Sequence, residues 1–333
     1  MTQGGASAGT GALGRSMLDT IGGTPLVELR HVCDEAEGRL VAKLECSNPT
    51  GSKADRVAKV VLEDATAAGY LSRCQTVAMT ADVASSLAFA HVCAVLRHPL
   101  VVVLSRGASV DVDTLAAYGC EVVLVDQHPS SPRGRVTALD RALCTAELQK
   151  IVRVTGAFDP DLLRNPSAFR AHRLGTGQEI VRQLDGQFGV FVDFVGTGAT
   201  LAGCAAAFQE RDTRVRCYAA EPVGAAALSG EAVVVDDHGI DGGGLGLAQL
   251  PLLSPERLAG VVRVTYEEAR RAQSDLARKE GLLAGLSTGA NVAAARKLLH
   301  GECFGETVVV VVHDSGPRRP TATAALERGL DAA

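Results

Sequence analysis

The sequence predicts an α/β fold with parallel sheets, and two observations support this. Short apolar runs rich in β-branched residues alternate with longer segments of helical composition along most of the 333 residues. Continuous apolar runs are typical of parallel strands buried on both faces, and their alternation with helices indicates strand–helix–strand units. A hydrophobic content of 47% allows a core large enough for two domains.

The individual elements follow from these patterns in chain order. Strands are expected at Leu40–Leu44, Thr76–Met79, Leu100–Leu104, Glu121–Val125, Phe188–Val195, Arg214–Ala219 and Thr307–Val312. Helices are expected at Asp55–Ala68, Ala84–Leu96, Val110–Tyr118, Thr137–Leu148, Pro166–Leu184, Tyr266–Glu280 and Thr288–Leu299. Proline, serine and glycine in Gln127–Arg135 predict a break in the pattern, and the seven glycines of Gly224–Leu250 predict a flexible region.

Composition excludes several classes of protein. The net charge of −5 provides no basic surface for nucleic acid or an anionic membrane, and a chain without tryptophan has few stacking platforms for bases. No apolar run reaches the roughly 20 residues that a membrane span needs. Residues 1–14 form no signal peptide and are expected to be a flexible tail. The nine cysteines, without any C-x-x-C pair, favour a reduced, cytoplasmic protein without a metal site.

The most informative motif is Asn48-Pro-Thr-Gly-Ser-Lys-Ala-Asp-Arg56. It resembles the N-P-[ST]-G-S-x-K-D-R segment of the fold type II (β-family) pyridoxal-phosphate enzymes, the cysteine synthase and cystathionine β-synthase group. Other segments are similar to that family in the same order: Ile21–Val27, Gly196–Gly203, Gly239–Gly246, Glu280–Ala290 and Val309–Gly316. The resemblance therefore covers almost the whole chain after the tail.

The resemblance implies an architecture that pattern alone does not reveal. It implies a fold type II pyridoxal-phosphate enzyme fold of two α/β domains, with the site in the cleft between them. Residues 15–44 and 151–333 would form the large domain and residues 45–150 the small domain. It also implies a homodimer.

A glycine-rich turn offers a site for the cofactor phosphate. The residues Gly196, Thr197, Gly198, Ala199 and Thr200 join a predicted strand to a helix start, where backbone N–H groups and the helix dipole favour an anion. By resemblance this loop binds the phosphate of pyridoxal phosphate, and the hydroxyl of Ser315 contacts the pyridine nitrogen. An ordinary strand–helix turn and a turn-forming serine are the structural alternatives.

Two departures from the family pattern bear on activity. The position of the family's Schiff-base lysine holds Ala54, and Lys53 stands one residue earlier. Consecutive residues diverge by about 100° at a helix start, so we expect Lys53 to point away from the site as a solvated surface lysine. The segment that begins at Thr80 falls where the family carries the substrate loop T-S-G-N-T-G; Thr80 matches it, but Ala81, Asp82, Val83 and Ala84 replace the next four residues. Asp82 would repel a substrate carboxylate.

These departures leave three functional hypotheses. The first is a cysteine-synthase-like pseudoenzyme or repurposed homologue that binds pyridoxal phosphate non-covalently or not at all, acting as a binding or accessory subunit with an active paralogue as partner. The second is an active β-replacement enzyme in which Lys53 forms the Schiff base and an activated serine becomes cysteine or a β-substituted alanine. The third is a pocket that binds another small anionic ligand. The histidines show no spacing typical of a metal site, and His313 and Asp314 are expected to be a structural pair at a strand end.

Overall fold

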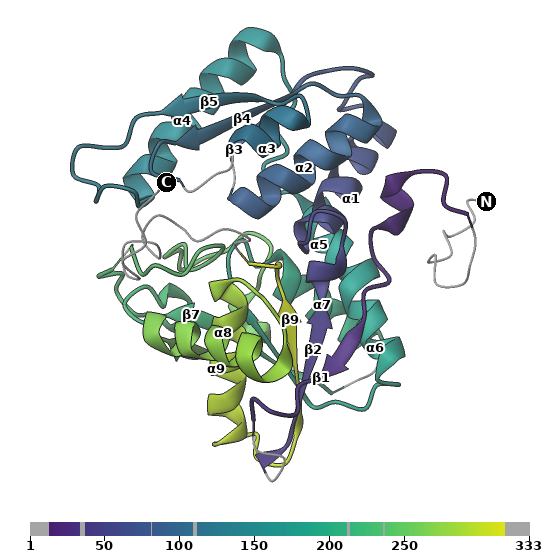
Figure 1. Ribbon diagram of the computed structural model, residues 1–333, viewed down its shortest axis with the longest axis vertical. Coiled ribbons are helices and arrows are strands. Elements are labelled where there is room, and N and C mark those ends of the chain that lie inside the picture. The colour runs from purple at the N-terminus through teal and green to yellow at the C-terminus, as the bar shows by residue number, and fades with distance from the viewer. Residues whose placement is uncertain are drawn as a thin grey trace.

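Two sheets form the framework of the molecule (Figure 1). The computed structural model describes residues 13–33, 37–80, 82–108, 112–211, 214–235 and 237–316. The larger sheet has the strand order β1-β2-β9-β6-β7-β8, in which only the β1–β2 pair is antiparallel. The smaller sheet has the order β3-β4-β5 and is parallel throughout. The predicted α/β class with parallel sheets is confirmed.

The strands are short, and the main helices follow them in alternation. The strands are β1 (Leu26–Glu28), β2 (Arg39–Leu44), β3 (Val77–Thr80), β4 (Leu100–Ser105), β5 (Glu121–Val125), β6 (Val190–Phe194), β7 (Arg216–Pro222), β8 (Gly260–Val264) and β9 (Thr307–Val312). The α-helices are α1 (Ala54–Ala67), α2 (Val83–Leu96), α3 (Val112–Ala117), α4 (Ala138–Thr155), α5 (Pro166–Ala171), α6 (Gln178–Gln183), α7 (Ala199–Glu210), α8 (Tyr266–Glu280) and α9 (Leu286–Leu299). Short helical turns are η1 (Met17–Thr20), η3 (Glu45–Ser47), η5 (Ala227–Ser229) and η6 (Pro255–Arg257), and η4 (His172–Gly177) is a π-helix.

The predicted strands are all present, and two further strands escaped prediction. Strands β1 and β8 lie at the two ends of the larger sheet. An edge strand has one neighbour and is only partly buried, so its sequence lacks the continuous apolar run of a central strand. The predicted single helix Pro166–Leu184 is interrupted by the π-helix η4. Such π segments occur frequently at functional sites.

Helices cover both faces of the larger sheet. Val308, Val310 and Val312 of β9 face α8 and α9, while Val309 and Val311 face α6 and α7. This alternation is the period of two that a strand imposes on its side chains. In the smaller sheet, α1, α2 and α3 cover one face and α4 the other.

The two sheets come from different parts of the chain. The smaller sheet uses residues 77–125, and the larger sheet uses residues 26–44 together with 190–312. The exact domain limits given above stay a prediction, and α4 continues five residues past the proposed limit at residue 150. None of the described helices is long and apolar enough to cross a membrane.

Candidate functional site

The loop Gly196–Thr200 leads from the end of β6 into α7. Gly198 is the N-cap of α7 and adopts φ +82°, a conformation that favours glycine. A Cβ at this position would lie 2.8 Å from Cβ of Leu253. The N-cap Gly198 makes no side-chain hydrogen bond, and the N–H of Ala199 donates to Oγ1 of Thr197 at 3.4 Å. The N–H groups at a helix start point outward along the axis, where an anion can bind. The loop therefore has the backbone geometry of an anion site.

A chain of hydrogen bonds leads inward from this loop through His172. Thr200 Oγ1 lies 3.3 Å from Nε2 of His172, whose Nδ1 lies 3.0 Å from Oγ1 of Thr176. The Thr176 hydroxyl donates to Glu45 Oε1 at 3.3 Å. A hydroxyl has one proton, so Thr176 accepts from Nδ1–H of His172 and Thr200 donates to Nε2. Burial, assisted by the positive charge of Lys53, lowers the pKa of His172 to about 3, so the ring is neutral at pH 7.

Lys53 lies directly before α1, and its side chain points into the protein. Its backbone N–H donates to the carbonyl oxygen of His313 at 2.8 Å. Its Nζ lies 4.0 Å from Oδ2 of Asp193, and the side chain is only 21% exposed. The expectation of a solvated surface lysine is therefore wrong. The neighbouring Ala54 is 8% exposed and packs in the core of the small domain with Ala58 and other apolar residues of α1 and α2.

Asp193 is a buried carboxylate in an otherwise apolar strand. Its Oδ1 lies 2.5 Å from Nε2 of His313, and its side chain is 3% exposed. Burial alone would raise the pKa of Asp193, but the charges of Lys53 and His313 outweigh it and lower the pKa to about 2. The carboxylate is thus ionised, and Nε2 of His313 carries the proton between them. His313 pairs with Asp193, whereas its expected partner was Asp314.

Asn291 of α9 holds this corner of the sheet together. Its Oδ1 accepts from the backbone N–H of Phe194 at 2.5 Å, and its Nδ2 donates to the carbonyl oxygen of Val311 at 2.8 Å. The side chain therefore bridges β6 and the end of β9, and Nδ2 also lies 3.1 Å from Nε2 of His313. Asp193 and His313 are held in register by this bridge.

Ser315 follows β9 and packs against the motif that contains Lys53. Its backbone N–H donates to the carbonyl oxygen of Gly51 at 2.9 Å. Gly51 has φ +83°, and a Cβ there would lie 2.7 Å from Oγ of Ser315. Because β6 and β9 are parallel neighbours, Ser315 and the Gly196–Thr200 loop lie at the same edge of the sheet.

The segment Thr80–Ala84, expected from the resemblance to be the substrate loop, lies at the end of β3. Thr80 is the last residue of β3, Val83 and Ala84 begin α2, and Ala81 lies outside the described residues. Asp82 is the N-cap of α2 and accepts from the backbone N–H of Ser85 at 2.7 Å. Asp82 therefore has a structural role in addition to the negative charge that it brings to this loop.

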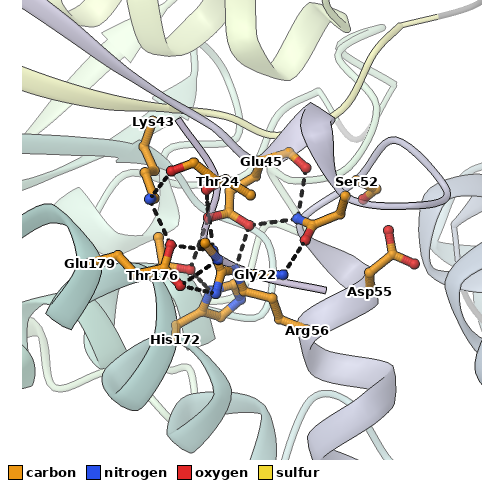
Figure 2. Close-up of polar contacts among 12 residues, drawn as sticks. Gly22, Thr24, Lys43, Glu45, Ser52, Asp55, Arg56, His172, Thr176 and Glu179 are labelled. Atoms are coloured by element: carbon orange, nitrogen blue, oxygen red, sulfur yellow. Dashed lines mark hydrogen bonds and ion pairs between the residues drawn. The ribbon is translucent and has the colours of Figure 1, made fainter. Parts of the chain in front are cut away.

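An ionic network connects Arg56, the last residue of the motif, with Glu45 and Glu179 (Figure 2). Glu179 accepts from Nζ of Lys43 at 2.7 Å and from both terminal nitrogens of Arg56 at 2.7 Å. Arg56 Nε also donates to Glu45 at 2.6 Å. Asp55 points away from this network, and one of its oxygens accepts from Thr50. The network has two cations and two anions, so its buried charges balance.

The comparisons with known proteins agree with this geometry. Residues 17–314 match the family described as "Pyridoxal-phosphate dependent enzyme". The chain belongs to this family. Cysteine synthase from Staphylococcus aureus is 32% identical over 306 residues, covering 91% of this chain and 94% of that protein. Cysteine synthase 3 from Caenorhabditis elegans is 30% identical over 303 residues, covering 90% and 86%.

Two solved structures illustrate that this fold is shared with known enzymes. O-ureido-L-serine synthase superposes with a TM-score of 0.84 at 29% identity, covering 97% of this chain and 98% of that one. O-acetylserine sulfhydrylase isoform 3 from Entamoeba histolytica superposes with a TM-score of 0.83 at 26% identity, covering 100% and 93%. The fold type II assignment is confirmed, and the chain is cysteine-synthase-like.

Pyridoxal phosphate, the cofactor named in the family description, has a candidate phosphate site in this structure. The start of α7 and the glycine conformation at Gly198 suit a phosphate. Ala54 lies in the small-domain core, whereas the neighbouring Lys53 is paired with Asp193. The residues present thus suit an anion at the start of α7, and Lys53 is held in an ion pair with Asp193.

Several of these residues escaped the sequence interpretation. Asp193 lies within the apolar run Phe188–Val195, and Lys43 lies within Leu40–Leu44. A single charged residue inside a run that reads as a buried strand is a usable signal, because buried charges need partners. His172 gave no comparable signal, because its contacts come from segments distant in sequence.

Proposed function

We propose that this protein is a repurposed member of the cysteine-synthase-like family that holds a small anion in its cleft without a covalent bond to lysine. The observation that carries the proposal is the ion pair between Lys53 and the buried, ionised Asp193, at 4.0 Å. A lysine attacks a carbonyl carbon only as the neutral amine, and a carboxylate partner stabilises the ammonium instead. Ala54, which occupies the position of the resembled family's lysine, lies inside the small-domain core.

The altered substrate loop supports the same proposal. The loop that grips the substrate carboxylate in the resembled family has lost its asparagine, and Asp82 adds a negative charge there. Since Asp82 caps α2, its position is fixed by the helix. An α-amino acid would meet repulsion at its carboxylate. We therefore propose a binding or accessory subunit, with an active paralogue as a partner.

Cellular location and assembly are part of the proposal. The acidic composition and the nine cysteines, all free thiols, suit a reducing cytoplasm. A homodimer is proposed by resemblance to the family. Light scattering of the purified protein tests the dimer, and a monomer would contradict it.

The test of the main proposal is a search for a covalent cofactor adduct. The purified protein is incubated with pyridoxal phosphate, reduced with borohydride, digested and analysed by peptide mass spectrometry. We expect reversible binding and no specific adduct at Lys53. Modification of the exposed Lys150, which pairs only with Glu147 on the surface of α4, measures the non-specific background. An adduct at Lys53 well above that background would overturn the proposal.

A second candidate function has one specific observation in its favour. The Lys53 side chain points inward, toward the strand that leads into the Gly196–Thr200 loop. In this alternative Lys53 is the Schiff-base residue of an active β-replacement enzyme. Turnover of O-acetylserine or O-phosphoserine with sulfide, abolished in Lys53→Ala, would establish it. Absence of turnover with either substrate would reject it.

A further inference from the structure

Asp193 and Lys53 form a pair that joins two distant parts of the chain. Asp193 comes from β6 of the larger sheet, whereas Lys53 precedes the first helix of the small domain. The carboxylate is 3% exposed, and its neighbours Phe191 and Val195 on the same face of the strand are apolar and buried. A carboxylate in such surroundings needs a cationic partner, because an unpaired buried charge is strongly destabilising.

The charged and titratable groups around Lys53 identify that partner. His172 of η4 is neutral, since burial lowers its pKa to about 3. His313, which follows β9, donates to Oδ1 of Asp193, and Oδ2 of the same carboxylate faces Lys53. The two oxygens thus have separate partners, and His313 fixes the orientation of the one that faces the lysine.

We propose that Asp193 is a positioning residue that suppresses reaction of Lys53 with carbonyl ligands. The inference deepens the proposed function, because it names the residue responsible for the loss of covalent chemistry. Reaction with an aldehyde requires that the ammonium release a proton to solvent. The amine lone pair then forms a C–N bond, and the carbonyl oxygen leaves as water. The ion pair with the buried Asp193 carboxylate stabilises the Lys53 ammonium, so the release of its proton is disfavoured.

The prediction is that removal of the Asp193 charge makes Lys53 reactive. Asp193→Asn keeps the size and hydrogen-bonding capacity of the side chain but removes its charge. With pyridoxal phosphate as the probe at pH 7.5, we expect borohydride-fixed labelling of Lys53 to become at least about ten-fold faster than in the wild type, since charges 4 Å apart in a partly buried site interact strongly. Asp193→Glu retains the charge and is expected to keep labelling within about three-fold of the wild-type rate, within the context-dependence of such pairs.

Further variants separate this effect from a structural one. Lys53→Ala combined with Asp193→Asn should lose the specific label. Retention of the wild-type rate in Asp193→Glu is a result that a general loosening of the fold would not produce, because both substitutions disturb the packing around position 193. Circular dichroism and thermal melting check that each variant folds. If Asp193→Asn does not fold, Asp193→Ser replaces it as the variant without the charge.

The outcomes distinguish the failure of this inference from the failure of the proposed function. If folded Asp193→Asn still binds pyridoxal phosphate reversibly but labels no faster than the wild type, Asp193 does not suppress Lys53 and the inference is overturned. If the wild type itself labels at Lys53 but at least about ten-fold more slowly than the variant, the proposed function fails and the inference stands. If both label equally fast and well above the background measured at Lys150, both are overturned.

Discussion

The buried His172 allows a sharp prediction about acid stability. Its folded-state pKa is lowered to about 3, first by burial and then by Lys53, against an ordinary value near 6.5. The unfolded chain therefore binds a proton at pH values where the native ring cannot. Stability from this group is fully present above about pH 6.5 and is lost as the pH falls toward 3.

The magnitude follows from linkage. At pH 5.0 protonation of His172 in the unfolded state costs the native state about 2 kcal/mol, whereas at pH 7.5 the cost is about 0.1 kcal/mol. We expect the free energy of unfolding of the wild type to fall by that difference, about 2 kcal/mol, between pH 7.5 and pH 5.0 because of this residue alone. His172→Gln retains a hydrogen-bond donor and acceptor but cannot titrate, so it should lack this part of the loss.

The assay compares differences, so the variant's own destabilisation cancels. Urea unfolding curves are recorded for both proteins at pH 7.5 and pH 5.0, and the free energies of unfolding are extrapolated to water. The control is His300→Gln, because His300 is 60% exposed at the end of α9. We expect the control to keep the wild-type pH dependence. If His172→Gln also kept it within about 0.5 kcal/mol, His172 would not be the buried neutral group described here.

Three further predictions concern the ionic network, the substrate loop and the anion loop. Glu179→Gln removes a carboxylate that binds Arg56 in two places, leaving an excess of buried positive charge, and should lower the free energy of unfolding by about 3–5 kcal/mol in urea titrations. Asp82→Ala removes a helix cap and should cost about 1 kcal/mol by the same measurement. Gly198→Ala should cost about 2–4 kcal/mol, because it combines a left-handed backbone with a 2.8 Å approach to Leu253, and should weaken phosphate binding measured by calorimetry.

Each of these has a matched control. Glu147→Gln removes a carboxylate on the surface of α4 and should change stability by less than about 1 kcal/mol. Asp82→Asn can still cap α2 and should be nearly neutral. Gly156 also has a left-handed backbone, with φ +67°, but an added Cβ would meet no neighbouring atom. Gly156→Ala should therefore lower the free energy of unfolding only by the backbone strain, about 1–2 kcal/mol. Equal effects in a variant and its control would contradict the corresponding argument.

Much of the fold was accessible from the sequence because local patterns determine it. The runs Val308–Val312 and Leu100–Leu104 consist of apolar residues typical of central strands, and the structure places them in the central strands β9 and β4. The edge strands β1 and β8 and the π-helix η4 were not predicted, since partial burial and an inserted residue leave weak local patterns. The family resemblance correctly supplied the fold type II assignment.

The sequence by itself shows a lysine at position 53 and an alanine at position 54, and helix geometry predicts that the two side chains diverge. It could not determine which of them faces the site. Tertiary structure decided this, because the hydrogen bond from Lys53 N–H to His313 fixes the start of α1 against the large domain. Ala54 then falls in the small-domain core, and Lys53 meets a carboxylate 140 positions away in the sequence, at Asp193. Local sequence patterns do not reveal contacts between segments so far apart. The burial cost of the Asp193 carboxylate and its attraction to Lys53 can therefore be weighed only in the folded structure.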